Sequence, residues 1–257
     1  MTAPLHPPLE IARQALACLD LTSLNDGDTE VDIQRLCERA IGPPGRGPTA
    51  AVCVWPRFAA LARHRLPAGI AVAAVANFPA GGSDIDAAVR DTRAIVAAGA
   101  QEVDVVLPWR DLAAAPVLLK AVRRACEGLL LKVILETGEL GSDAQIARAC
   151  RIALAAGVDF LKTSTGKAKV SATPHAARLL LQAIAADGQA RHRVGFKPAG
   201  GIRSLADAAL YLELTAEVLG REATRPQRFR IGASALLNEL EAVLLGAPAP
   251  AAAPSSY

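Results

Sequence analysis

The stretch DFLKTSTGK, residues 159–167, joins a short apolar strand to a polar loop that contains glycine. Lys162 ends the strand, and Lys167 lies in the loop. A lysine within an apolar strand is costly to bury unless its charge is matched or removed. Lys162 is therefore either the solvated end of an ordinary strand or a functional group with partners on other strands.

The rest of the chain repeats this alternation of short apolar runs with longer segments of helical periodicity, which predicts a parallel sheet. Eight runs qualify as strands: residues 18–22, 50–55, 70–77, 102–107, 130–136, 159–163, 193–197 and 228–232. Eight strands with eight following helices predict a (β/α)8 TIM barrel. The alternative is an open doubly wound sheet, but the first strand is not followed by a Gly-x-Gly-x-x-Gly turn.

Residues that favour the start of a helix lie between the predicted strands. An amphipathic segment over residues 9–17 predicts an extra N-terminal helix. We expect later helices to begin at five capping residues: Ser83, Ser142, Thr173, Ser204 and Ser234. Residues 1–246 are expected to form a single TIM-barrel domain, and residues 247–257, rich in proline and alanine, a flexible tail.

The composition limits the partners that this chain is expected to have. The 257 residues are 52% hydrophobic, 21% charged and carry a net charge of +3, without a basic stripe for nucleic acid. No apolar segment has the length of a membrane span, so we expect a cytoplasmic protein with no membrane partner. The five scattered cysteines and four histidines lack metal-ligand spacing, which predicts free thiols and no metal.

Strand alternation predicts a charged cluster inside the barrel. The face that turns Lys162 inward also turns Lys197, Asp104 and Lys132 inward, and Glu136 shares the face of Lys132. Lys162 and Lys197 lie at the carboxyl ends of their strands, where barrels hold functional groups. The alternative is an inert ion cluster in which Asp104 pairs with Lys132.

Three lysines around one carboxylate would leave positive charge uncompensated, and uncompensated charge lowers a lysine pKa. A lysine must lose about 3.4 pKa units, roughly 4.6 kcal/mol, to be half neutral at pH 7. A second ammonium about 5 Å away supplies roughly 3.3 kcal/mol at an effective dielectric of ~20. We therefore expect charge repulsion to supply most of the shift, desolvation the remainder, and the neutral amine to form a Schiff base.

Glycine-bearing loops at the same end of the barrel predict a phosphate site. Gly200 and Gly201 follow the seventh strand, and residues 232–234 follow the eighth and open a helix. Loops after strands seven and eight of such barrels commonly bind phosphate through backbone N–H groups. Gly166 and Lys167 are expected to add an amide and a positive charge.

Five segments resemble the deoxyribose-phosphate aldolase family: residues 160–167, 195–201, 102–106, 19–26 and 53–58. The similarity runs from about Leu16 to Leu245. It implies a class I aldolase without metal or cofactor that reversibly cleaves 2-deoxy-D-ribose 5-phosphate to acetaldehyde and D-glyceraldehyde 3-phosphate, in deoxyribose phosphate catabolism. Its partners would be the phosphorylated sugar and the aldehydes, and a homodimer is left open.

The resemblance also implies roles for single residues. Lys162 would form the Schiff base, Lys197 would perturb its pKa and move protons, and Asp104 would relay protons through water. The phosphate site maps onto seven residues: Gly166, Lys167, Gly200, Gly201, Arg203, Gly232 and Ser234. Strand alternation does not say which lysine attacks, so that choice rests on the resemblance.

Some features depart from the family pattern or leave alternatives open. Ala235 stands where some members have a second serine, so one phosphate contact is lost or replaced, and the longer loop 43–48 is expected to alter the barrel mouth. Tyr257 either returns as a proton shuttle or belongs to a disordered tail, and Cys53 either reacts with unsaturated aldehydes or is an inert thiol. Two rival functions use the same groups: a non-catalytic barrel that carries pyridoxal phosphate, and a transaldolase-like enzyme.

Overall fold

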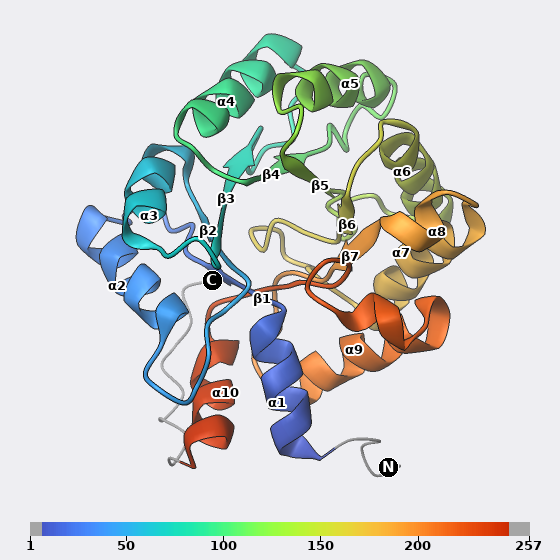
Figure 1. Cartoon of the computed structure of the whole chain (residues 1–257). Helices are drawn as coiled ribbons and strands as arrows, with labels where there is room; N and C mark the ends of the chain where they lie inside the picture. Colours follow the sequence, from blue (N-terminus) through green and yellow to red (C-terminus); the bar gives the residue numbers. More distant parts are fainter. Residues whose placement is uncertain (1–6, 247–257) are drawn as a thin grey trace.

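The chain folds into a closed barrel of eight parallel strands, as Figure 1 shows for the computed structural model, which describes residues 7–246. The strands are β1 Leu19–Thr22, β2 Ala51–Val54, β3 Ala71–Ala76, β4 Glu102–Val106, β5 Leu130–Ile134, β6 Phe160–Lys162, β7 Gly195–Lys197 and β8 Ile231–Ala233. Consecutive strands pair from β1 to β7, and β8 pairs with β1. Two isolated parallel bridges, Phe196 with Phe229 and Ala199 with Gly232, join β7 to β8. The (β/α)8 prediction is confirmed, and the open sheet is excluded.

Helices surround the barrel in the order that the sequence predicted. The longer ones are α1 Pro8–Ala17, α2 Glu30–Ile41, α3 Ala59–Arg65, α4 Ile85–Ala97, α5 Ala115–Ala125, α6 Asp143–Ala155, α7 Pro174–Ala186, α9 Leu205–Leu219 and α10 Leu236–Leu245. Short helices add η1 Pro56–Phe58, α8 Ala190–Arg193 and η2 Arg221–Thr224. The helix α1 is the predicted N-terminal addition, and within residues 7–246 no helix combines the length and hydropathy that crossing a bilayer requires.

Three of the five predicted helix starts are confirmed. Ser142, Thr173 and Ser204 each accept a hydrogen bond from a backbone N–H of the first turn. The start predicted at Ser83 is wrong because Asp84, one residue later, caps α4. Ser234 is also not a cap: Ala235 takes the capping position of α10, with no side-chain hydrogen bond. Ser234 therefore lies directly after β8, and its hydroxyl does not cap the helix.

The loop 43–48 does not alter the mouth of the barrel, which corrects that expectation. It connects α2 to the start of β2, so it lies at the amino ends of the strands, opposite the functional end. Arg46 is buried there and donates to Glu241 on α10 at 2.7 Å and to the carbonyl oxygen of Arg39 at 2.7 Å. Arg46 therefore links α10 to α2, so this loop stabilises the fold.

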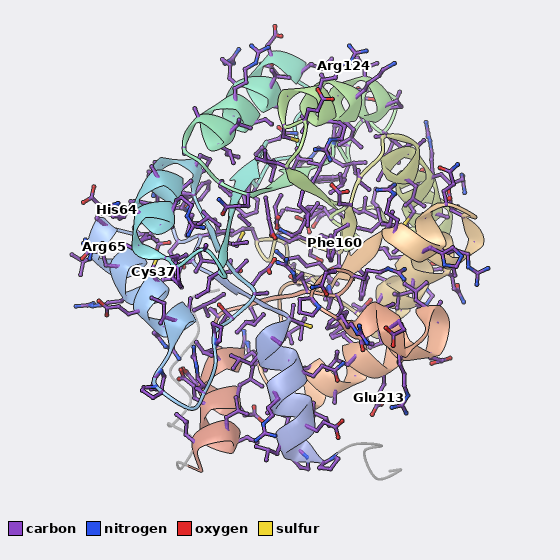
Figure 2. All side chains as sticks on the ribbon, viewed as in Figure 1. Cys37, His64, Arg65, Arg124, Phe160 and Glu213 are labelled. Atoms are coloured by element: carbon purple, nitrogen blue, oxygen red, sulfur yellow. The ribbon has the colours of Figure 1, made fainter. Side chains whose placement is uncertain are left out.

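The barrel interior contains an apolar cluster and a group of buried charged side chains. An apolar cluster of Leu24, Cys53, Ala73 and Val75 lies toward β1, β2 and β3. Figure 2 shows Phe160 near the centre of the barrel, and the guanidinium of Arg230 lies over its ring, 5.8 Å from the centroid. Buried charged side chains come from β1, from β4 to β7 and from the residue before β8. The larger apolar core lies outside the sheet, between the strands and the helices. The interior thus holds most of the buried charged side chains.

Candidate active site

A network of charged side chains fills the barrel interior. Asp104 on β4 accepts hydrogen bonds at Oδ2 from Lys162 Nζ and Lys197 Nζ, both at 2.8 Å. Its Oδ1 accepts from Lys132 Nζ at 2.7 Å. All four side chains are buried, and Lys162 is only 2% exposed. The structure brings together the four residues that strand alternation placed in one interior.

Three further charged residues in this network were missed from the sequence. Arg230, just before β8, donates to Asp20 on β1 at 2.6 Å and to Glu102 on β4 at 2.8 Å. Asp20 accepts from Lys197 at 2.5 Å, and Glu102 accepts from Lys132 at 2.5 Å. The expectation of three lysines around a single carboxylate was therefore wrong. Strand alternation contained the signal, because Glu102 shares the face of Asp104.

The contacts distinguish the lysines from one another. The network has four basic and three acidic side chains: Lys132, Lys162, Lys197, Arg230, Asp20, Glu102 and Asp104. One positive charge is in excess when all are ionised. Among residues 7–246, Lys162 pairs with one carboxylate, Lys197 with two, and Lys132 with two at hydrogen-bond distance and a third at 3.6 Å. Lys162 is therefore the lysine that loses its proton most readily.

The pKa shifts follow this order of contacts. Burial is the largest cause that lowers the pKa of Lys162, and the Lys197 ammonium lowers it further, while Asp104 opposes both. Burial would also lower the pKa of Lys132 and Lys197, but their carboxylate partners outweigh it and raise both. Desolvation, rather than charge repulsion, is thus the main cause at Lys162. The expected order of the two causes was wrong because carboxylates already compensate Lys197.

The two aspartates of the network, Asp20 and Asp104, stay ionised. Burial alone would raise the pKa of Asp104, but Lys132, Lys162 and Lys197 hold it well below its ordinary value. Burial is likewise outweighed at Asp20, where Lys197 and Arg230 lower the pKa. Asp104 is therefore a permanent hydrogen-bond acceptor beside the amine of Lys162.

Five of the seven predicted phosphate-binding residues line a small pocket at the carboxyl ends of the strands. Its lining includes Gly200, Gly201 and Arg203 after β7, and Gly232 and Ser234 at β8. Within the described part of the chain, the backbone N–H groups of Gly201 and Ser234 have no hydrogen-bond partner. Free N–H groups beside a helix N-terminus favour an anion.

The loop after β6 lies beside this pocket. Gly166 lies against Gly200, because a Cβ on Gly200 would come within 3.0 Å of the Gly166 Cα. Gly200 also has a φ of +82°, a conformation that favours glycine. Lys167 follows on the exposed rim, where its N–H donates to Thr165 Oγ1 at 3.0 Å. Three loops therefore converge where the sequence predicted one phosphate site.

Glu136 holds this loop and does not join the lysines. β5 ends at Ile134, and Glu136 has a φ of +54°, so strand alternation no longer applies to it. Its carboxylate accepts hydrogen bonds from the N–H and the hydroxyl of Thr165, at 3.2 and 2.5 Å. The placement of Glu136 with Lys132 was therefore wrong, and burial raises the pKa of this carboxyl.

Cys53 lies in the interior, as expected, with Sγ 4.0 Å from Asp104 Oδ2. Its side chain is fully buried, and burial raises the pKa of the thiol. A protonated, buried thiol is a poor nucleophile, which favours the inert alternative. The other open alternative, Tyr257, lies outside the described residues, as does the predicted tail.

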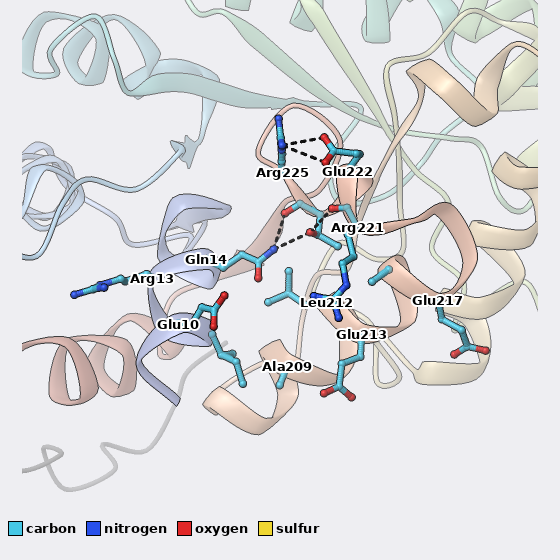
Figure 3. A pocket seen from close by; sticks show the side chains of 13 residues that line it. Glu10, Arg13, Gln14, Ala209, Leu212, Glu213, Glu217, Arg221, Glu222 and Arg225 are labelled. Atoms are coloured by element: carbon cyan, nitrogen blue, oxygen red, sulfur yellow. Dashed lines mark hydrogen bonds and ion pairs between the residues drawn. The ribbon is translucent and has the colours of Figure 1, made fainter. Parts of the chain in front are cut away.

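A separate cavity of about 760 Å³ opens on the outside of the barrel (Figure 3). It lies between α1, α9 and η2, and its lining includes Gln14, Leu212 and Glu213. Gln14 and Thr224 are hydrogen-bonded across it at 2.7 Å. None of the interior lysines lines it, so volume alone does not identify the reactive site.

Comparisons with known proteins agree with this geometry. The family model described as DeoC/LacD family aldolase matches residues 14–242. A deoxyribose-phosphate aldolase of Agrobacterium fabrum is 46% identical over 265 residues, covering all of both chains. A solved structure from Toxoplasma gondii, assigned as a deoxyribose-phosphate aldolase, has a TM-score of 0.83 and 27% identity, over 93% of this chain and 96% of that one. One from Coccidioides immitis with the same assignment has a TM-score of 0.78 and 27% identity, over 90% and 85%. The chain therefore belongs to the DeoC/LacD family of aldolases.

Proposed function

We propose that this aldolase reversibly cleaves 2-deoxy-D-ribose 5-phosphate into acetaldehyde and D-glyceraldehyde 3-phosphate, through a Schiff base on Lys162. The observation that carries the proposal is a buried lysine with a lowered pKa, 2.8 Å from an ionised carboxylate. A neutral amine attacks carbonyl carbon, and the resulting iminium accepts the electrons of a breaking carbon–carbon bond. The small pocket formed by the loops after β7 and β8, with the loop after β6 against Gly200, supports a phosphorylated substrate.

The proposed reaction begins when Lys162 Nζ adds to the open-chain aldehyde at C1 and water leaves, which gives an iminium. A base removes the proton of the C3 hydroxyl, the C2–C3 bond breaks, and its electrons form an enamine while D-glyceraldehyde 3-phosphate departs. A proton then adds to C2, and water hydrolyses the iminium to acetaldehyde and free Lys162. Asp104 and Lys197 share a hydrogen bond at 2.8 Å and are assigned the proton relay, with water as the carrier.

Borohydride reduction in the presence of acetaldehyde tests this proposal. Reduction would convert the iminium to a stable ethyl group on the reacting lysine, which peptide mass mapping locates. We expect the label on Lys162, and less of it when 2-deoxy-D-ribose 5-phosphate competes. A label on Lys197 would keep the aldolase and exchange the lysine roles. An unlabelled protein would contradict the mechanism, and a donor screen in the same assay separates the transaldolase-like rival.

Ser234 is proposed to bind the substrate phosphate. Replacing it with alanine is expected to raise KM for 2-deoxy-D-ribose 5-phosphate about 10-fold or more, because hydrogen bonds to charged groups contribute roughly 1.5–3 kcal/mol. The kcat/KM for unphosphorylated 2-deoxyribose should stay unchanged, since that sugar makes no phosphate contact. Ala235→Ser is the reciprocal variant, and its added hydroxyl should lower KM for the phosphorylated sugar alone. Equal effects on both sugars would contradict this assignment.

The cytoplasmic location is kept as part of the proposal. All five cysteines are free and buried, as suits a reducing compartment. The homodimer stays a prediction, which sedimentation of the purified protein would measure. Pyridoxal phosphate on the lysine remains the rival function, and it requires a coloured protein as purified.

A further inference from the structure

Arg230 belongs to the interior network but has no role in the proposed reaction. It contacts neither Lys162 nor Asp104 directly, yet it is more than nine-tenths buried. Its guanidinium binds Asp20 at 2.6 Å, and Glu102 at 2.8 and 3.2 Å. Burying an arginine needs compensation of this kind, and two carboxylates supply it. The two carboxylates, however, are the ones that hold the other two lysines.

The chains of contacts from Arg230 lead to the reactive amine from two sides. On one side Asp20 binds Lys197, and on the other side Glu102 binds Lys132. Both lysines then bind Asp104, which is the carboxylate partner of Lys162. Arg230 therefore fixes the two outer carboxylates, these fix the two outer ammonium groups, and Lys162 is left with one shared carboxylate.

We propose that Arg230 is a positioning residue whose charge makes Lys162 the lysine that loses its proton. This proposal rests on the proposed function. With Arg230 present, four basic groups face three acidic ones, so neutral Lys162 balances the network. Without the guanidinium, three lysines face three carboxylates, and the balanced state has Lys162 protonated. The nucleophile would then be lost at neutral pH, although every catalytic residue is still present.

The titratable and charged groups around Lys162 come from several neighbouring strands. They are Asp20 from β1, Cys53 from β2, Glu102 and Asp104 from β4, Lys132 from β5, Glu136 after β5, Lys197 from β7 and Arg230 before β8. Cys53 is a neutral thiol, and Glu136 is bound to Thr165 outside the network. Their charges are the same with and without Arg230, so they do not alter the direction of the expected shift.

The test is the pH profile of kcat/KM and of borohydride labelling at Lys162, measured in the full chain. In Arg230→Met the acid limb of both profiles is expected to move up by about one pH unit or more, a tenfold smaller fraction of neutral amine. Activity should therefore recover as the pH is raised. Arg230→Lys keeps the charge and should keep the acid limb near its original position. A variant that merely loosened the barrel would lose activity at every pH.

Two further variants separate charge from shape. Arg230→Met/Glu102→Gln removes one charge of each sign, so its acid limb should return toward that of the unmodified chain. Arg228→Met is the matched control: Arg228 lies two residues away and donates to the carbonyl oxygens of Arg191 and Val194, at 2.7 and 3.2 Å. Its acid limb should not move. An unshifted limb in Arg230→Met, with Lys162 labelled in the unmodified chain, overturns this inference alone. An unmodified chain without label overturns the proposed function.

Discussion

Replacing Lys162 with methionine is expected to reduce cleavage of 2-deoxy-D-ribose 5-phosphate by roughly 10⁵-fold or more, the scale of losing a covalent nucleophile. Methionine has nearly the same length, but it cannot form an iminium. Borohydride labelling with acetaldehyde should disappear from the chain as well. Turnover of the sugar phosphate and peptide mapping of the label together measure this result.

Lys162→Arg is the control for this substitution, because it keeps a cation beside Asp104 and is also unable to form a Schiff base. If Lys162 acted only by charge, the arginine variant would keep activity. A label that moved to Lys197 in the methionine variant, with turnover retained, would contradict the assigned roles.

The same methionine variant is expected to be at least as stable as the unmodified chain. Folding lowers the pKa of Lys162, so the native state binds fewer protons than the unfolded state. Its stability therefore falls as the pH drops from the ordinary lysine pKa toward the lowered pKa of the folded state, and part of this loss is already present at neutral pH. Methionine removes that loss, and Asp104 keeps its hydrogen bonds to Lys132 and Lys197. A thermal melt of both proteins at pH 7 checks the direction.

Asp104→Asn is expected to have the second largest effect, because it lowers both kcat and the free energy of unfolding. Losing the proton relay should reduce kcat by roughly 10²–10⁴-fold, the usual contribution of general acid–base catalysis. Removing the carboxylate also leaves buried ammonium groups uncompensated, which should lower the free energy of unfolding by about 3–5 kcal/mol. Turnover and denaturant unfolding measure the two losses separately.

The pH dependence of the lost stability follows from the pKa of Asp104. That pKa lies well below its ordinary value, so the stabilisation is fully present above the unfolded value of ~3.9. It should be lost only as the pH falls from there through the pKa of the folded state. The difference in unfolding free energy between the two proteins is therefore expected to be constant from about pH 5 to 8.

A double variant separates structure from chemistry at Asp104. Asp104→Asn/Lys132→Met removes one charge of each sign, so it should recover much of the lost stability. It should not recover turnover, because the acceptor beside Lys162 is still missing. Recovery of both properties would show that Asp104 serves only to balance charge, which is the inert-cluster alternative raised from the sequence.

Most of the fold was predictable because periodicity and burial agree along the chain. Each of the eight apolar runs became a strand, and only their ends moved by a few residues, as at β8, where the strand begins at Ile231. Helix starts were less predictable where two capping residues are adjacent, since Ser83 and Asp84 both have a suitable side chain. Only the backbone angles decide between such neighbours.

The meeting of Lys162, Lys197 and Asp104 was predictable because side chains alternate along a strand. Alternation says which face a residue occupies, but not how far neighbouring strands are staggered or how deep a group is buried. The contacts of Arg230 with Asp20 and Glu102 depend on that stagger. Desolvation, the main cause of the lowered pKa at Lys162, depends on depth. Both properties arise only when the barrel closes.

The interior charges are divided along the chain by sign. All three acids lie on β1 and β4, and all four bases lie between β5 and β8. A chain synthesised from its N-terminus thus completes a half-barrel in which only like charges would meet, with β4 as an open edge. That half cannot bury its acids until the second half arrives to neutralise them. Closure of the barrel therefore depends on the arrival of the basic side chains of β5 to β8, and an incomplete chain has no stable interior.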